Sequence, residues 1–234
     1  MRPIGTLAAF LAIGLGAFGP AFAETRLAVK HDHLFGSCKG QLIFDDEAVR
    51  YETEHAKHTR QWKYQDIQQI GLEPKKVTLL TYEDRLIYLG KDAEFSLALL
   101  EGQVDDSLRA FLENKVARPL VSSVLPATTE ARYRIPVKHR KGLGGTQGAL
   151  ELSDQYVLYR TAAKSDSRIW RYDELLSVGS TGPFQLRITA IEHAGAGYGD
   201  GKNFVFELKQ RLPEQAYDFL WNKINRPRID GRAE

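Results

Sequence analysis

The sequence predicts a mainly β fold with α-helices (α+β), arranged as two tandem units. Each unit is expected to hold seven or so antiparallel strands in a bent sheet or partly open barrel, capped by a C-terminal helix. An eight-residue stretch that begins at Arg60 returns at Arg168, 108 residues later, with Trp and Tyr in the same places. Apolar and polar residues alternate in both copies, which is typical of strands with one buried face. Each copy then ends in apolar residues at three- and four-residue steps, which is typical of an amphipathic helix.

The first 23 residues form a leader of a different kind. Arg2 precedes an apolar run over residues 7–18, and small residues lead up to Ala23. This pattern predicts a secretory signal peptide cleaved after Ala23. An anchoring helix is the alternative, although glycines interrupt a run that is short for a membrane span. We therefore expect a secreted or periplasmic mature chain without a transmembrane segment.

The first unit is predicted over residues 24–119 and the second over residues 133–228. In the first, strands are expected near residues 26–31, 40–44, 49–53, 60–64, 77–82, 86–89 and 95–99, and a helix over 104–116. In the second, they are expected near residues 134–139, 148–152, 157–161, 168–172, 185–189 and 204–208, with a helix over 213–224. An Arg-Pro pair follows each helix and predicts its end. Residues 120–132, rich in Ser, Thr, Ala and Pro, are expected to be a linker, and residues 229–234 a disordered tail.

Composition narrows the class of partner. The chain has 32 basic and 30 acidic residues, a formal charge of +2, and this balance argues against nucleic acid as a partner. Cys38 is the only cysteine, so no internal disulfide is available to the exported chain. Such a cysteine is expected to be a small buried hydrophobe, with a free reactive thiol as the alternative.

Four short motifs occur in both units. In the first unit they are Gly40/Leu42, Val49/Tyr51, Trp62/Tyr64/Asp66/Ile67 and Phe95/Leu97/Leu99, with counterparts 108 or 109 positions later. In this order of strands and helix, the chain resembles the pleckstrin-homology-like superfold, and within it the bacterial PH-like and GRAM-like domains. The resemblance implies a non-catalytic binding or scaffold protein for an unidentified protein, peptide or anionic ligand. The predicted signal peptide implies that it is exported, and no cofactor is expected. The repeated aromatic residues are expected to be structural core rather than a ligand slot: Trp62, Tyr64, Trp170 and Tyr172.

Two loops of the second unit are candidate ligand sites. A basic stretch leads into a glycine-rich turn, and its cations and exposed amides suit a phosphate, a carboxylate or a phospholipid head group at a membrane surface. A second glycine-rich loop over residues 195–201 carries an aromatic tip that suits a partner contact. The alternative for both is a plain hairpin connection. The residues concerned are Lys138, His139, Arg140, Lys141, Gly144, Gly145 and Tyr198.

Four histidines of the first unit are the remaining candidates. His31 and His33 share one face of a strand, and His55 and His58 lie in the loop before the first Trp motif. They would hold a metal ion only if strand and loop converge, so surface positions are the preferred interpretation and no metal is predicted. A metal-dependent enzyme is the third functional alternative. No HExxH motif and no nucleophile elbow is present, which favours a protein that is not an enzyme.

Overall fold

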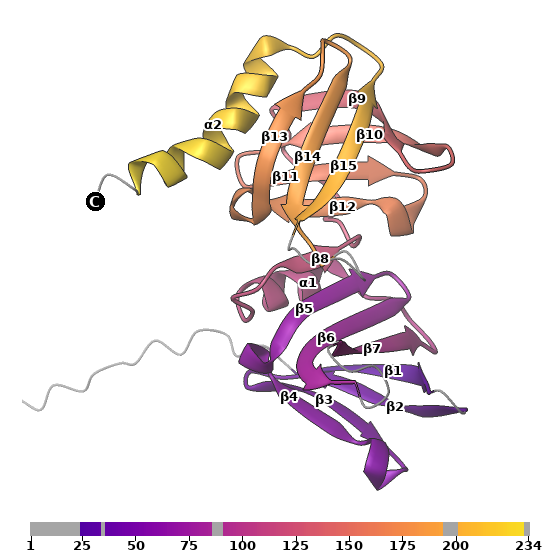
Figure 1. Ribbon diagram of the computed structural model, residues 1–234. Coiled ribbons are helices and arrows are strands. Elements are labelled where there is room, and N and C mark those ends of the chain that lie inside the picture. Colours follow the sequence, from indigo (N-terminus) through magenta and orange to yellow (C-terminus); the bar gives the residue numbers. More distant parts are fainter. Residues whose placement is uncertain (1–23, 34–35, 86–90, 194–200, 232–234) are drawn as a thin grey trace, which may run out of the picture.

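The computed structural model describes residues 24–33, 36–85, 91–193 and 201–231 (Figure 1). The predicted signal peptide and Tyr198 lie outside these residues. The first half contains β1 (Thr25–Asp32), β2 (Ser37–Phe44), β3 (Ala48–Thr53), β4 (Arg60–Lys63), β5 (Ile67–Glu73), β6 (Lys76–Asp84), β7 (Asp92–Leu99) and α1 (Asp106–Glu113). Then come β8 (Leu120–Ser122) and the second half, with β9 (Tyr133–Arg140), β10 (Gly145–Leu152), β11 (Tyr156–Thr161), β12 (Arg168–Arg171), β13 (Leu175–Ser180), β14 (Gln185–Ile191), β15 (Gly201–Leu208) and α2 (Glu214–Asp230).

All strands within the described residues belong to one sheet. Its order is β13-β14-β15-β9-β10-β11-β12-β8-β5-β6-β7-β1-β2-β3-β4, a continuous sheet of 15 strands. The prediction of two separate units, each a seven-stranded sheet capped by its own helix, is therefore wrong. Within the sheet, the seven strands on either side of β8 follow the same relative order, so positions in one half have structural counterparts in the other.

β8 is the reason for the single sheet. It lies in the segment 120–132 that composition predicts to be a linker. Leu120 to Ser122 pair in parallel with β5, and Ser122 pairs antiparallel with Ile169 of β12. Strands β5 and β12 would otherwise each leave a row of unpaired N–H and C=O groups at a sheet edge. Because β8 satisfies both edges, the connection becomes part of the sheet.

Two clusters of buried side chains lie on either side of β8. The first joins strands of the first half with Leu108, Phe111 and Leu112 of α1, and the second joins strands of the second half with Leu220 and other residues of α2. Asp105 caps α1 by accepting a hydrogen bond from the Leu108 amide at 3.0 Å. These cores hold the hairpins of each half in place.

Helix α2 is longer than the sequence predicts. The prediction ends it near residue 224, but it passes through Pro227 and reaches Asp230, within the segment expected to be a disordered tail. The Arg228 guanidinium donates to the carbonyl oxygens of Leu175 and Leu176 at the start of β13, the latter at 2.8 Å. Figure 1 shows this helix beside β13, with its end leading away from the sheet.

The repeated aromatic residues occupy corresponding places. Trp62, Tyr64 and Trp170 are buried, and Tyr172 is half-buried. The Tyr64 hydroxyl donates to the carbonyl oxygen of Asp45 and the Tyr172 hydroxyl to that of Ser153, each at 2.7 Å. These tyrosines anchor the β2–β3 and β10–β11 turns.

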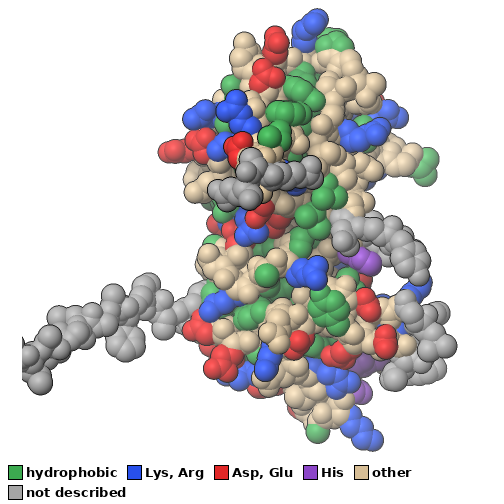
Figure 2. Space-filling view, turned by 60° about the vertical axis from the view of Figure 1, so that its left-hand side comes forward, with side chains coloured by type: hydrophobic (Ala, Val, Ile, Leu, Met, Phe, Trp, Pro, Cys, Tyr) green, Lys and Arg blue, Asp and Glu red, His purple; other side chains and the backbone are tan. Residues whose placement is uncertain are grey.

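The surface carries charges of both signs. On the face shown in Figure 2, Lys and Arg side chains are interspersed with Asp and Glu side chains over both halves. In the described part of the chain, no helix is both long and apolar enough to span a membrane.

Candidate metal centre

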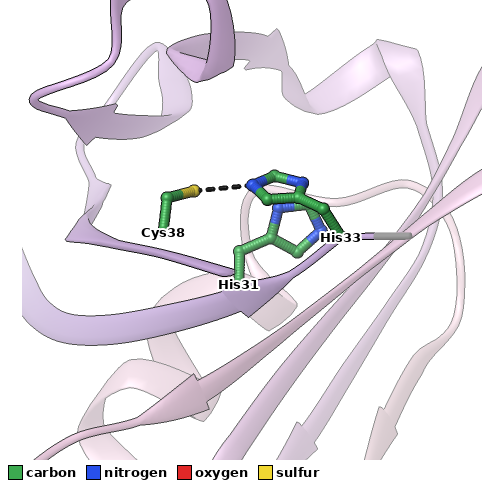
Figure 3. Close-up of side chains that lie close together, drawn as sticks. All are labelled: His31, His33 and Cys38. Atoms are coloured by element: carbon green, nitrogen blue, oxygen red, sulfur yellow. Dashed lines mark hydrogen bonds between the residues drawn. The ribbon is translucent and has the colours of Figure 1, made fainter. Parts of the chain in front are cut away.

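The β1–β2 hairpin brings two histidines and the cysteine together (Figure 3). His31 lies directly opposite Cys38 across the two strands, and His33 follows the end of β1. Because side chains alternate along a strand, His31 and His33 point to the same side. One ligand atom from each of the three residues can be chosen so that all lie within 4.8 Å of one another. The sequence pattern indicated these histidines as possible metal ligands but not Cys38, because the place of Cys38 opposite His31 depends on the hairpin register.

The thiol is in direct contact with one imidazole. Nε2 of His33 lies 2.8 Å from Sγ of Cys38, and the His31 and His33 rings stand 4.5 Å apart between centroids. Cys38 is buried, whereas both histidines are half-buried. Metal bonds of about 2.0 Å to nitrogen and 2.3 Å to sulfur put the donor atoms of one ion roughly 3.3–3.8 Å apart. Binding therefore requires the distance between Nε2 of His33 and Sγ of Cys38 to lengthen by about 1 Å.

Tyr51 holds the thiol from the other side. Its hydroxyl lies 3.0 Å from Sγ of Cys38 and donates to the Cys38 carbonyl oxygen at 3.2 Å. Burial raises the pKa of Tyr51, and the hydrogen bond to Cys38 adds to this effect. The hydroxyl thus keeps its proton, which it can donate to the Cys38 carbonyl oxygen or to the sulfur. Gly40 makes this arrangement possible, because a Cβ there would lie 2.8 Å from Cε2 of the Tyr51 ring.

The loop after β3 brings the remaining two histidines nearby. The rings of His33 and His58 have centroids 4.4 Å apart, and those of His55 and His58 are 5.8 Å apart. Nδ1 of His58 is buried and has no hydrogen-bond partner among the described residues. His55 is exposed. Strand and loop therefore do converge, with His58 near the three-residue cluster and His55 at its outer edge.

Burial and neighbouring charges lower the pKa of two of the imidazoles, which favours their neutral form. Burial lowers the pKa of His31, and the nearby His33 adds to this, while Asp32 opposes it. Burial and the charges of the neighbouring histidines also lower the pKa of His58. A neutral imidazole has a free lone pair, which coordination of a metal requires. Asp32 is exposed, and its carboxylate pairs with Lys30 at 2.8 Å.

The same place in the second half is filled by charges of the chain itself. The residues 108 positions after His31, His33, Cys38, Tyr51 and His58 are, in that order, His139, Lys141, Thr146, Tyr159 and Asp166. Lys141 Nζ lies 2.8 Å from one carboxylate oxygen of Asp166, and Nδ1 of His139 lies 3.4 Å from the other. Thr146, opposite His139 across β9 and β10, also donates to Asp166. In this network the positive charge of Lys141 and the negative charge of Asp166 neutralise each other. The first half has a thiol and imidazoles at the corresponding places.

The predicted anion site is not an open cluster of cations. His139 and Lys141 both face Asp166, and Arg140 pairs with Glu207 at 3.5 Å. Lys138 is half-buried on β9. A carboxylate at the centre of the group repels an anionic ligand.

Gly144 and Gly145 shape the β9–β10 turn. Both have positive φ, at 86° and 156°, and the Gly144 carbonyl accepts a hydrogen bond from the Lys141 amide. The structure thus places the predicted loop residues in a closed hairpin.

Comparison with known proteins leaves the family open. No protein-family model matches the chain. Peptide chain release factor 1 from two strains of Leptospira biflexa serovar Patoc is 23% identical over 186 residues, which is 75% of this chain and 46% of the relative. The chain thus spans about half the length of the curated relatives it matches. The structure of the Spt16D Pob3N heterodimer aligns over 84% of this chain and 99% of that one, with 9% identity and a TM-score of 0.30.

Proposed function

We propose that this chain is an exported, non-catalytic binding protein, and that it binds a transition-metal ion through His31, His33 and Cys38. The observation that carries the proposal is the convergence of two imidazoles and one thiol within 4.8 Å. Imidazole nitrogen and thiolate sulfur are the ligands that zinc and copper ions take in proteins. The predicted signal peptide supports export, and the resemblance to PH-like domains supports binding rather than catalysis.

The contrast between the halves supports a ligand in the first one. The second-half network is closed by the Lys141–Asp166 ion pair. At the corresponding places the first half has His33 and His58, and neither brings a negative charge.

The test is metal binding by the purified protein and by a variant that copies the second half. His33→Lys/Cys38→Thr/His58→Asp recreates the Lys–Thr–Asp network and is expected to remain folded. We expect the wild-type protein to retain a stoichiometric metal ion after dialysis against Zn²⁺ or anaerobic Cu⁺, and the triple variant to retain none. His55→Ala, which removes an exposed imidazole near the cluster, is the matched control and should bind as the wild type does. Equal retention by wild type and triple variant would refute the proposal.

Export is tested separately. N-terminal sequencing of the protein recovered from the periplasm or medium should begin at Glu24. A chain found only in the cytoplasm with Met1 intact would contradict export and leave the metal proposal standing.

A further inference from the structure

We infer that the site selects a monovalent, sulfur-seeking cation, copper(I), held in a trigonal set by His31, His33 and Cys38. This inference rests on the proposed function, because it names the ion that the same cluster takes. Three independent features of the cluster lead to it: the kind of ligand atoms, the balance of charge, and the number of ligands that meet.

The ligand atoms are soft. Sulfur of Cys38 and ring nitrogens of His31 and His33 make up the group of three. Thiolate sulfur favours copper(I), and imidazole suits copper as well, whereas carboxylate and carbonyl oxygens suit hard cations. The nearest acidic group along β1, Asp32, is exposed and paired with Lys30. The cluster therefore offers little to magnesium, calcium or manganese.

The charge of the cluster matches a single positive charge. Metal binding removes the thiol proton of Cys38, and the two imidazoles remain neutral, so the ligands together carry one negative charge. A monovalent ion makes this complex neutral. A divalent ion would leave a net positive charge beside the buried Cys38. An unbalanced buried charge is unfavourable.

At the corresponding place in the second half, one positive and one negative charge also neutralise each other. Lys141, at the place of His33, supplies one positive charge, and Asp166, at the place of His58, supplies one negative charge 2.8 Å away. In the first half, the Cys38 thiolate would supply the negative charge and the bound ion the positive one. Each half would then contain one cation and one anion. In each half a tyrosine hydroxyl also contacts one residue of the group: Tyr51 contacts Cys38, and Tyr159 contacts Thr146.

The number of ligands separates copper(I) from zinc. Three donors suit a trigonal ion, whereas zinc takes a fourth ligand, which is a protein side chain in structural sites and a water molecule in open ones. His58 is the residue able to become a fourth ligand, since its ring lies 4.4 Å from that of His33 and its Nδ1 has no described partner. A closed zinc site with four protein ligands would therefore depend on His58, and trigonal copper(I) binding would not.

Anaerobic competition between the protein and a chromophoric copper(I) chelator provides the test, with and without a large molar excess of Zn²⁺. We expect one Cu⁺ per chain, unaffected by Zn²⁺, and replacement by Ag⁺ as a redox-inert stand-in. Cys38→Ser and His33→Gln should each weaken Cu⁺ binding by more than the roughly 10–100-fold that loss of an outer-shell partner causes. His58→Gln should change it by less than about threefold, a shift of roughly 0.6 kcal/mol. Circular dichroism and urea unfolding of each variant separate a lost ligand from a lost fold.

The outcomes separate the two proposals. Displacement of Cu⁺ by Zn²⁺, or a strong loss of Cu⁺ binding in His58→Gln, would overturn the monovalent trigonal site while leaving metal binding intact. Absence of stoichiometric binding by Cu⁺, Ag⁺ and Zn²⁺ alike would overturn both.

Discussion

Cys38 and Thr146 stand at the same place in the two halves, each in contact with a tyrosine hydroxyl, at 3.0 Å from Tyr51 and 2.9 Å from Tyr159. The surrounding residues differ: Cys38 also contacts His33, whereas Thr146 also donates to Asp166. One scaffold position thus carries a soft metal ligand in one half and part of an ion-pair network in the other. This pairing makes Tyr159 a matched control for Tyr51.

The Tyr51 hydroxyl is expected to tune metal affinity without being a ligand. Tyr51→Phe removes the hydrogen bond to Cys38 sulfur and should weaken metal binding by about 10-fold. Tyr159→Phe removes the equivalent contacts of the second half, so both variants should lose about 1–2 kcal/mol in free energy of unfolding, but only Tyr51→Phe should lose affinity. The measurements are metal competition and urea unfolding. Equal affinity of the two variants would show that Tyr51 has no such role.

Gly40 is expected to tolerate no side chain. A Cβ there would lie 2.2 Å from the Glu52 carbonyl oxygen and 2.8 Å from the Tyr51 ring. Gly40→Ala must move β3 or the ring, so we expect a loss of about 2–4 kcal/mol in free energy of unfolding. Gly179→Ala is the control, because a Cβ there meets nothing within 4 Å, and it should change stability by less than about 1 kcal/mol. A stable Gly40→Ala protein with normal metal binding would contradict the described packing.

Asp166 is expected to stabilise the second half in a pH-dependent way. Burial opposes its ionisation, but hydrogen bonds from Lys141 and Thr146 and the nearby His139 lower the pKa of this carboxyl below 3.8 overall. A lowered pKa means that the contribution to stability is complete above about pH 3.8 and is lost as the pH falls through the folded-state value. Asp166→Asn should therefore lower the free energy of unfolding by about 1–3 kcal/mol at pH 7 and by progressively less in acid.

Urea unfolding of Asp166→Asn between pH 2 and 7 measures this effect. Asp173→Asn, which changes a carboxylate with 70% side-chain exposure, serves as the control and should differ little from the wild type. A difference between Asp166→Asn and wild type that stays constant down to pH 2 would argue against an ionised Asp166 in the network.

Glu174 is expected to have the opposite pH dependence. Its carboxylate accepts from the Leu120 amide of β8 and from the Arg171 amide, and burial raises its pKa above the ordinary 4.5. The folded state then holds the proton more tightly than the unfolded chain. The contribution of Glu174 to the free energy of unfolding therefore increases as the pH falls from the folded-state pKa to about pH 4.5.

The comparison is between wild type and Glu174→Gln, which cannot titrate. Between the folded-state pKa of Glu174 and about pH 4.5, the free energy of unfolding of the wild type should rise relative to that of Glu174→Gln as the pH falls. The rise should be at most about 1.4 kcal/mol per pH unit. Glu54→Gln, at an exposed position, should show no such trend. A difference that is flat with pH would mean that Glu174 titrates normally at the β8 junction.

Local pattern predicted much of the chain and missed the joint between its halves. Alternation around Val49 to Thr53 predicted a strand where β3 lies, because alternation reports which face of a strand is buried. Composition predicted a linker at residues 120–132, yet Leu120 to Ser122 pair with two strands that are far apart in sequence. Polar, Pro-containing composition cannot report that two open sheet edges stand close enough for one short strand to fill both.

The candidate metal site shows the same contrast between what the local sequence predicts and what the tertiary structure decides. The sequence determined by itself that positions in one half have counterparts 108 residues later, and that four histidines lie in two short segments of the first half. Only the tertiary structure decided that Cys38 joins His31 and His33, that Asp166 occupies the basic loop, and that one sheet runs through both halves. Periodicity records the local burial of each strand. Strand register, loop position and edge pairing are set by hydrogen bonds and packing between segments distant in sequence.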